Sequence, residues 1–126
     1  MQRSTLIRTF AALRFTTGAA AWLLPNTTAR LMGLSSGRDQ PFTTQLFGSR
    51  ELTLAVAITD AASPRLRTRA LQLGLLTDVL DVIAAIRGLR ARTLSSSGAI
   101  VAGGGAALFA SLGVAALSGR EQSACG

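Results

Sequence analysis

The sequence predicts an all-α fold, an integral membrane bundle of four transmembrane helices with short loops. Only 15% of the 126 residues are charged and 48% are hydrophobic, whereas about a quarter of the residues in a soluble domain are charged. The apolar residues gather in four long segments, and the polar residues inside them fall on narrow stripes. A soluble amphipathic helix would show a broad polar side. We therefore expect residues 1–126 to form one domain within a membrane.

The first predicted span covers about residues 6–24 and ends at Pro25, a residue that interrupts helices. Trp22 lies near that end, where an indole suits the boundary between lipid and water. Residues 27–34 are expected to form a short interfacial helix or turn, and residues 33–39 a polar loop.

The other three predicted spans cover about residues 42–62, 70–86 and 98–117. Pro64 follows the second span and is expected to end it. The last span is the only one that meets the simple rule of about twenty uncharged residues. Two clusters of arginine flank the third span: Arg65, Arg67 and Arg69 before it, and Arg87, Arg90 and Arg92 after it.

The charged residues favour a membrane over nucleic acid as the partner of this chain. All thirteen basic residues are arginine and the net charge is +7. They lie mostly between apolar segments, where they would meet lipid headgroups, and do not alternate with aromatic residues on one polar face. The chain has no histidine, and Cys125 is its single cysteine. This composition excludes a His/Cys zinc site and an intrachain disulfide, and no metal or other cofactor is expected.

Two other interpretations of the apolar segments remain open at this stage. The chain could be a soluble helical bundle with one apolar hairpin, although no charge lies between Thr93 and Gly119. Alternatively, residues 3–21 could be a cleaved signal peptide, although Arg14 would then interrupt its apolar core.

Five ionisable residues lie in the middle of the predicted spans, where a charge is costly and usually marks function. Arg14, Arg50 and Asp78 each lie about eight residues into their span, or about 12 Å deep at the helical rise. In a hydrocarbon core of about 30 Å, helices of alternating direction would bring all three near the midplane. The five residues expected to meet there are Arg14, Arg50, Glu51, Asp78 and Asp81.

The helical repeat places these charges on stripes beside small or aromatic residues. Asp78 and Asp81 share a stripe with Gly74, because the three residues are spaced by four and three positions. Phe47 precedes Arg50 and Glu51 on another stripe. The first span carries Arg14, Gly18 and Ala21 on one stripe, with Thr17 beside them. We predict that a substrate would contact Phe47, Thr17, Gly74 and Trp22.

The predicted cluster combines two guanidinium groups with three carboxyl groups, so one carboxyl is expected to keep its proton. Asp78 and Asp81 could then divide the roles of general acid and general base. Arg14 or Arg50 would hold a carboxylate and orient a substrate oxygen. The alternative is an ion network that only fixes the register of the helices.

Four stretches of the sequence carry a resemblance to a known family: LRFTTGAAAWLLP, ARLMGL, LFGSRELTLAVAI and LLTDVLDVIAAI. Their order resembles that of small four-helix membrane proteins of actinobacteria and fungi, grouped as a domain of unknown function. The resemblance covers roughly residues 14–86 and implies membrane residence, but no particular chemistry. The family pattern corresponds here to Arg14, Gly18, Pro25, Gly48, Arg50, Glu51, Asp78 and Asp81.

From these observations we predict a multi-pass cell-membrane enzyme without a cofactor. Its carboxyl pair would perform acid–base chemistry on a lipophilic small molecule, such as hydrolysis of an epoxide, or cyclisation or isomerisation of a polyketide or terpenoid. The alternatives are a proton-coupled small-molecule transporter and a non-catalytic assembly subunit. The glycine-rich fourth span is expected to pack closely or to form a homodimer. The arginines are balanced between the two ends of the bundle, so charge does not fix the orientation.

Overall fold

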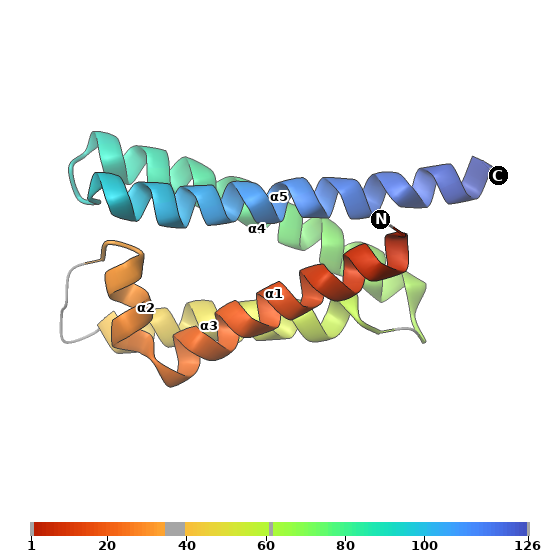
Figure 1. The fold of residues 1–126 in the computed structure, drawn as a ribbon, viewed down its shortest axis with the longest axis horizontal. Helices are drawn as coiled ribbons and strands as arrows, with labels where there is room; N and C mark the ends of the chain where they lie inside the picture. Colours follow the sequence, from red (N-terminus) through yellow and green to blue (C-terminus); the bar gives the residue numbers. More distant parts are fainter. Residues whose placement is uncertain (1, 35–39, 61, 126) are drawn as a thin grey trace.

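The computed structural model is all-helical over the residues that it describes, which are 2–34, 40–60 and 62–125, with side chains for 2–34, 41–60 and 62–119. This result confirms the predicted all-α class. The helices are α1 (Arg3–Leu23), α2 (Pro25–Leu31), α3 (Gln40–Ile58), α4 (Pro64–Arg90) and α5 (Ser96–Cys125) (Figure 1). Each of the four predicted spans falls largely within one of the long helices.

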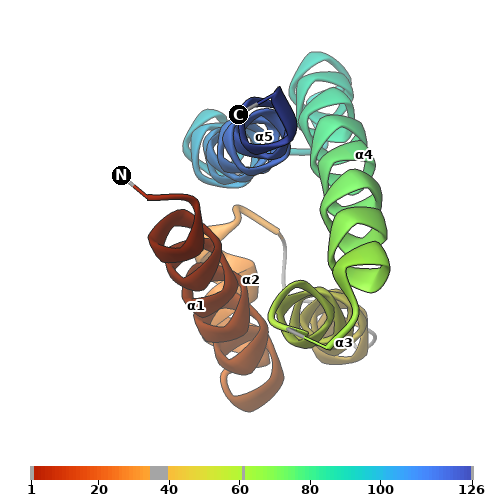
Figure 2. The same ribbon diagram turned by 90° about the vertical axis from the view of Figure 1, so that its right-hand side faces the viewer.

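The four long helices form two antiparallel pairs (Figure 1). α1 packs most extensively against α3, and α4 against α5. Seen along the bundle, α1 and α4 occupy opposite corners (Figure 2), and their backbones make no close contact. The short α2 packs mainly against α3. Any direct link between α1 and α4 must therefore come from long side chains.

The turn between α1 and α3 begins as the sequence predicts. Pro25 starts α2 at its first position, where its missing N–H leaves no bond unmade. Gly33 follows with a φ of 71°, and the N–H groups of Gly33 and Leu34 donate to the carbonyls of Arg30 and Ala29. This Schellman motif ends α2. The rest of the predicted polar loop, residues 35–39, lies outside the described residues.

The turn between α3 and α4 differs from the prediction. α3 ends at Ile58, four residues before the predicted end of the second span. The Nε of Arg67 donates to the Ile58 carbonyl, and this bond satisfies a backbone group at the helix end. Pro64 starts α4 and does not end α3, and Ser63 caps α4 by accepting a hydrogen bond from the Leu66 N–H. A proline in the first turn is compatible with a helix, and this rule overrides its role as an interrupter here.

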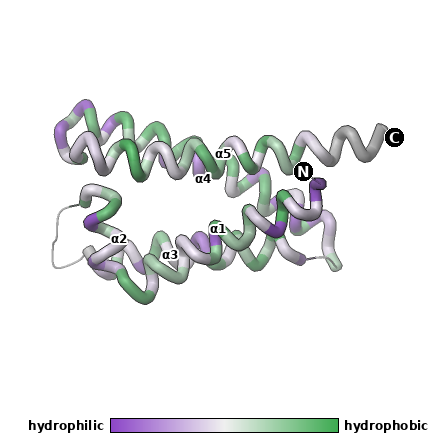
Figure 3. The backbone as a smooth tube through the Cα atoms, viewed as in Figure 1, coloured by the Kyte–Doolittle hydropathy of each residue, from purple (hydrophilic) through white to green (hydrophobic). Residues whose placement is uncertain are grey.

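Large apolar side chains cover the outside of the bundle, and charged side chains are buried among apolar ones inside it. Large aliphatic residues line the outside of every long helix, for example Leu13, Val56, Leu80 and Ile100. Among the described residues, three of the six largest fully buried side chains are apolar, Phe10, Ile58 and Leu71. The other three are charged, namely Arg14, Glu51 and Asp78. Figure 3 shows hydrophobic residues along the long helices and hydrophilic residues at the turn between α4 and α5.

By length and composition, one described helical stretch, Ser96–Gly119, is long and apolar enough to cross a membrane. The other long helices fall short because charged or polar side chains interrupt their apolar sequence.

Glycines allow close helix contacts at defined places. A Cβ atom on Gly18 would lie 2.9 Å from the Gly48 carbonyl oxygen, and one on Gly48 would lie 2.8 Å from the Gly18 oxygen. α1 and α3 thus cross with their backbones in contact. On α5, Gly103 faces Ala85 of α4, whereas Gly104 has no atoms of another residue close to its Cβ position. Only part of the glycine-rich α5 therefore serves packing within the chain.

Candidate functional site

Arg14 occupies the centre of the bundle and contacts every long helix. Its Nη1 donates to Glu51 Oε2 of α3 at 2.6 Å, and its Nη2 donates to Asp78 Oδ2 of α4. The guanidinium group lies over the rings of Phe10 and Phe109, with 4.7 Å and 4.9 Å to the ring centroids. Such stacking of a cation on aromatic faces is favourable, especially away from water. Phe109 belongs to α5, so one arginine links all four helices.

Gly74 makes this arrangement possible. A Cβ atom at this position would lie 3.0 Å from Arg14 Nη2, so a larger residue would press on the guanidinium group. Gly74 precedes Asp78 by one turn on the buried stripe of α4. The predicted small residue beside the aspartates is therefore in the network, where it makes room for Arg14.

A second arginine extends the network toward the surface. The Arg50 guanidinium group donates to Glu51 Oε1 at 3.2 Å and to Asp81 Oδ2 at 2.8 Å. Its central carbon lies 4.7 Å from the centroid of the Phe47 ring. The two arginines and three carboxyl groups thus alternate in the order Asp78, Arg14, Glu51, Arg50, Asp81. All five residues that the sequence predicted to meet are in this network.

The two ends of this network differ in exposure. Arg14, Glu51 and Asp78 are at most 1% exposed. The side chains of Arg50 and Asp81 are 33% and 35% exposed. In the described part of the chain, no buried side-chain nitrogen or oxygen lacks a hydrogen-bond partner. The buried end is therefore closed and satisfied, and only the Arg50–Asp81 end can meet another molecule in this conformation.

Asp78 and Asp81 do not face each other in the way that a shared proton would require. Asp78 binds Arg14, whereas Asp81 binds Arg50. Each carboxyl group thus has its own guanidinium partner. A carboxyl group that acts on a substrate must come within hydrogen-bond distance of it, and in this arrangement Asp81 alone of the two is accessible.

Two of the predicted substrate contacts lie outside the network. The Thr17 hydroxyl donates to the Leu13 carbonyl of its own helix. The Trp22 indole N–H donates to Ser49 Oγ, and the Trp22 carbonyl accepts from Gln45 Nε2. Trp22 therefore contributes to the contact between α1 and α3. Phe47 and Gly74 are in the network, where they contact arginines.

Phe10 and Phe109 were missed by the sequence analysis. Phe10 precedes Arg14 by one helical turn, so it shares the Arg14 face of the helix. That spacing could have revealed it. Phe109 lies in the uncharged segment, and nothing in its neighbourhood marks it as a partner of arginine. The two rings also meet edge to face, with centroids 5.6 Å apart.

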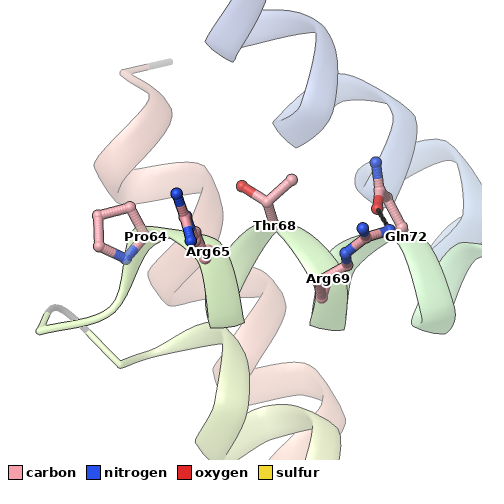
Figure 4. Close-up of a pocket in the computed structure, with 5 residues that line it drawn as sticks. All are labelled: Pro64, Arg65, Thr68, Arg69 and Gln72. Carbon is pink, nitrogen blue, oxygen red and sulfur yellow. Dashed lines mark hydrogen bonds between the residues drawn. The ribbon is translucent and has the colours of Figure 1, made fainter.

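The described residues contain no group of three or more His, Cys, Asp or Glu side chains that could hold a metal ion. A surface pocket of about 460 Å³ lies elsewhere, at the start of α4, where Pro64, Arg65, Thr68, Arg69 and Gln72 line it (Figure 4). It is separate from the network.

Comparisons with protein-family models, curated proteins and solved structures find no match to this chain. The resemblance to four-helix membrane proteins of unknown function therefore stays a prediction.

Proposed function

We propose that this chain is a multi-pass integral membrane protein in which α1, α3, α4 and α5 all cross the bilayer. The observation that carries this proposal is the combination of buried charged side chains with an outer surface of large aliphatic ones. Arg14, Glu51 and Asp78 are buried together, while large aliphatic residues cover the outside. Contact between such an apolar surface and water is unfavourable. Extended exposed apolar patches mark a binding or membrane surface. Polar residues inside a membrane face the interior of a bundle and pair with one another.

The dimensions of α4 support the same proposal. The stretch between Arg69 and Arg87 is about 26 Å long at the helical rise. A hydrocarbon core is about 30 Å thick, and arginine side chains at helix ends extend toward the headgroups. The charges within this stretch are Asp78 and Asp81, and each has a guanidinium partner. Pairing lowers the cost that hydropathy alone assigns to them.

We further propose that Arg50 and Asp81 form an acid–base site for a lipophilic small molecule. Asp81 is half-exposed and hydrogen bonded to Arg50. Its carboxyl group could transfer a proton to or from an oxygen of the ligand, and Arg50 could stabilise the negative charge that develops there. The buried Arg14, Glu51 and Asp78 would position α3 and α4. In the hydrolysis of an epoxide, Asp81 would give its proton to the epoxide oxygen while a water molecule attacks a ring carbon and the C–O bond breaks. The added water would then return a proton to Asp81. In a cyclisation, the same carboxyl group would give and recover the proton.

A hydrophobic carbodiimide tests whether Asp81 is accessible from the membrane. This reagent couples to protonated carboxyl groups that it can reach, forming a stable N-acylurea. We expect mass spectrometry to find the adduct on Asp81, and not on Glu51 or Asp78. The Asp81→Asn variant provides the control and should lose the adduct at this position. Labelling of Asp78, or none on Asp81, would contradict the assignment of Asp81 as the accessible group.

Turnover of lipophilic epoxides by the purified protein tests the chemistry. We expect the wild type to convert at least one member of a panel of long-chain epoxides to the diol. Asp81→Asn and Arg50→Gln should abolish that conversion and leave the helical content unchanged. Equal diol formation by the wild type and Asp81→Asn would reject the acid–base site.

A non-catalytic membrane subunit is the second candidate, and one observation favours it. The buried carboxyl groups of Glu51 and Asp78 both pair with Arg14, and none of the three side chains is exposed. Such a closed network can serve assembly. An accessible Asp81 without any turnover would favour this candidate. The proton-coupled transporter and the homodimer through α5 stay predictions.

A further inference from the structure

The pocket at the start of α4 is an open depression lined by two arginines that form no salt bridge with another described residue. Arg65, Thr68, Arg69 and Gln72 recur at intervals of three and four residues, so they share one face of the helix. Figure 4 shows Arg65, Thr68 and Gln72 extending to the same side of α4. The opposite face of this turn points into the bundle, where Arg67 binds the Ile58 carbonyl. The described residues thus show a contact between helices from the face of Arg67, and not from the pocket face.

The polar groups of the pocket are available to a ligand. Within the part of the chain that the structure describes, neither Arg65 nor Arg69 forms a salt bridge. Arg69 makes one long hydrogen bond, of 3.4 Å, to Gln72 Oε1. The Thr77 hydroxyl donates to the carbonyl four residues earlier, whereas the described residues offer no partner to the Thr68 hydroxyl. The pocket therefore presents two guanidinium groups and a hydroxyl, with no carboxyl group in its lining.

The two arginines and the threonine that line this pocket favour the binding of an anion with several oxygen atoms. Guanidinium groups bind phosphate through paired N–H donors, and a threonine hydroxyl can add a third donor. The backbone contributes little, because Pro64 has no N–H and Ser63 already caps the N–H of Leu66. The side chains would therefore carry the recognition. The depression has a volume of about 460 Å³ and is open to its surroundings, so it could take a phosphate with a glycerol group without enclosing it.

We propose that this pocket, lined by Arg65, Thr68, Arg69 and Gln72, is a binding site for a phosphate group, such as that of an anionic lipid headgroup. The site goes beyond the proposed acid–base function and does not depend on it. If α4 crosses the bilayer, Arg65 and Arg69 lie at the level of the headgroups. Arginines at this level attract anionic lipids.

The test compares two variants of equal charge. Arg65→Gln with Arg69→Gln removes the pocket arginines. Arg87→Gln with Arg90→Gln removes two exposed arginines at the other end of the same helix and is the matched control. Each purified full-length protein, in an uncharged detergent, is titrated with phosphatidylglycerol, phosphatidylcholine and inorganic phosphate. Native mass spectrometry counts bound lipid and calorimetry measures phosphate binding. Circular dichroism confirms that both variants keep the helical content of the wild type.

We expect the wild type to bind phosphatidylglycerol in preference to phosphatidylcholine. The pocket variant should bind at least about tenfold more weakly, and the control should match the wild type. If inorganic phosphate does not bind, the ligand is a lipid headgroup. If it binds and the pocket variant loses that binding as well, the site accepts a soluble phosphate. Binding that the pocket variant retains, or that both variants lose equally, would overturn the proposal.

Discussion

Arg14 is the residue on which the centre of the molecule depends. Its guanidinium group donates to Glu51 and Asp78 and stacks between two phenylalanine rings. Glu51 also accepts from Arg50, but Asp78 has Arg14 as its only guanidinium partner in the described residues. Removal of Arg14 would leave Asp78 unpaired in the interior. The loss of one partner from a buried pair is far more costly than the loss of an exposed pair.

We therefore expect Arg14→Leu to lower the free energy of unfolding by about 3–5 kcal/mol. Arg50→Gln removes the same charge at the half-exposed end of the network and should cost about 1 kcal/mol or less. Unfolding in mixed detergent micelles, followed by circular dichroism, measures both changes. An Arg14→Leu variant as stable as Arg50→Gln would show that the buried pairing does not hold the helices together.

At this residue scale the sequence predicted the members of the network but not their pairing. The mid-span depth and the stripes selected Arg14, Arg50, Glu51, Asp78 and Asp81. Asp78 and Asp81 have different partners, because Asp78 binds Arg14 of α1 while Asp81 binds Arg50 of α3. A helical repeat places both residues on one stripe and cannot assign them different partners.

At the scale of the helices, the crossing of α1 and α3 depends on the absence of side chains at Gly18 and Gly48. Each glycine lies against the carbonyl oxygen of the other. A backbone oxygen cannot move aside as a flexible side chain can, so an added methyl group must push the helices apart. Gly104 of α5 offers a comparison, because the space at its Cβ position is open.

We expect Gly18→Ala and Gly48→Ala each to reduce the free energy of unfolding by about 1–3 kcal/mol through overpacking. Gly104→Ala should be neutral or raise it by up to about 1 kcal/mol, because alanine favours a helix more than glycine does. The same micelle unfolding assay compares the three variants. A stable Gly18→Ala variant would contradict the close crossing, and a change in the oligomeric state of Gly104→Ala would support the predicted homodimer.

The helix boundaries show where local rules were sufficient. Pro25 begins α2, and Gly33 follows its end. Both positions follow from the backbone preferences of proline and glycine, which can be recognised in the sequence. Pro64 was misassigned, because a proline suits both the residue after a helix and the first turn of one. The Ser63 side-chain cap and the bond from Arg67 to the Ile58 carbonyl decide between them, and the second of these is a tertiary contact.

In the whole molecule, two helix pairs meet across the ion network. Arg14 and Arg50 belong to the α1–α3 pair, and they bind Asp78 and Asp81 of α4. The backbones of α1 and α4 do not approach each other closely, so Arg14 spans the diagonal of the bundle with its side chain. Besides these charged contacts, an apolar cluster that includes Phe10, Ile58 and Leu71 also joins the two pairs.

If all long helices cross a membrane, the two ends of α4 lie on opposite sides. In a Cys125→Ser background, we expect single cysteines at Ser63 and Ser95 to react with an impermeant maleimide in complementary fractions. These fractions should add up to the whole protein, whether the chain inserts in one orientation or in both. Full labelling at both positions, or at neither, would show that α4 does not cross. Quantitative mass spectrometry of labelled intact cells provides the measurement.

The sequence by itself determined the number of long helices, their approximate limits, and which charged residues face inward. Those features follow from hydrophobic periodicity and backbone preferences, which act over a few residues. Only the tertiary structure decided that Asp78 is sealed by Arg14 while Asp81 remains accessible beside Arg50, and that Phe109 covers the central guanidinium group. These features depend on distances between residues far apart in the chain, and such distances are fixed by how the helices pack.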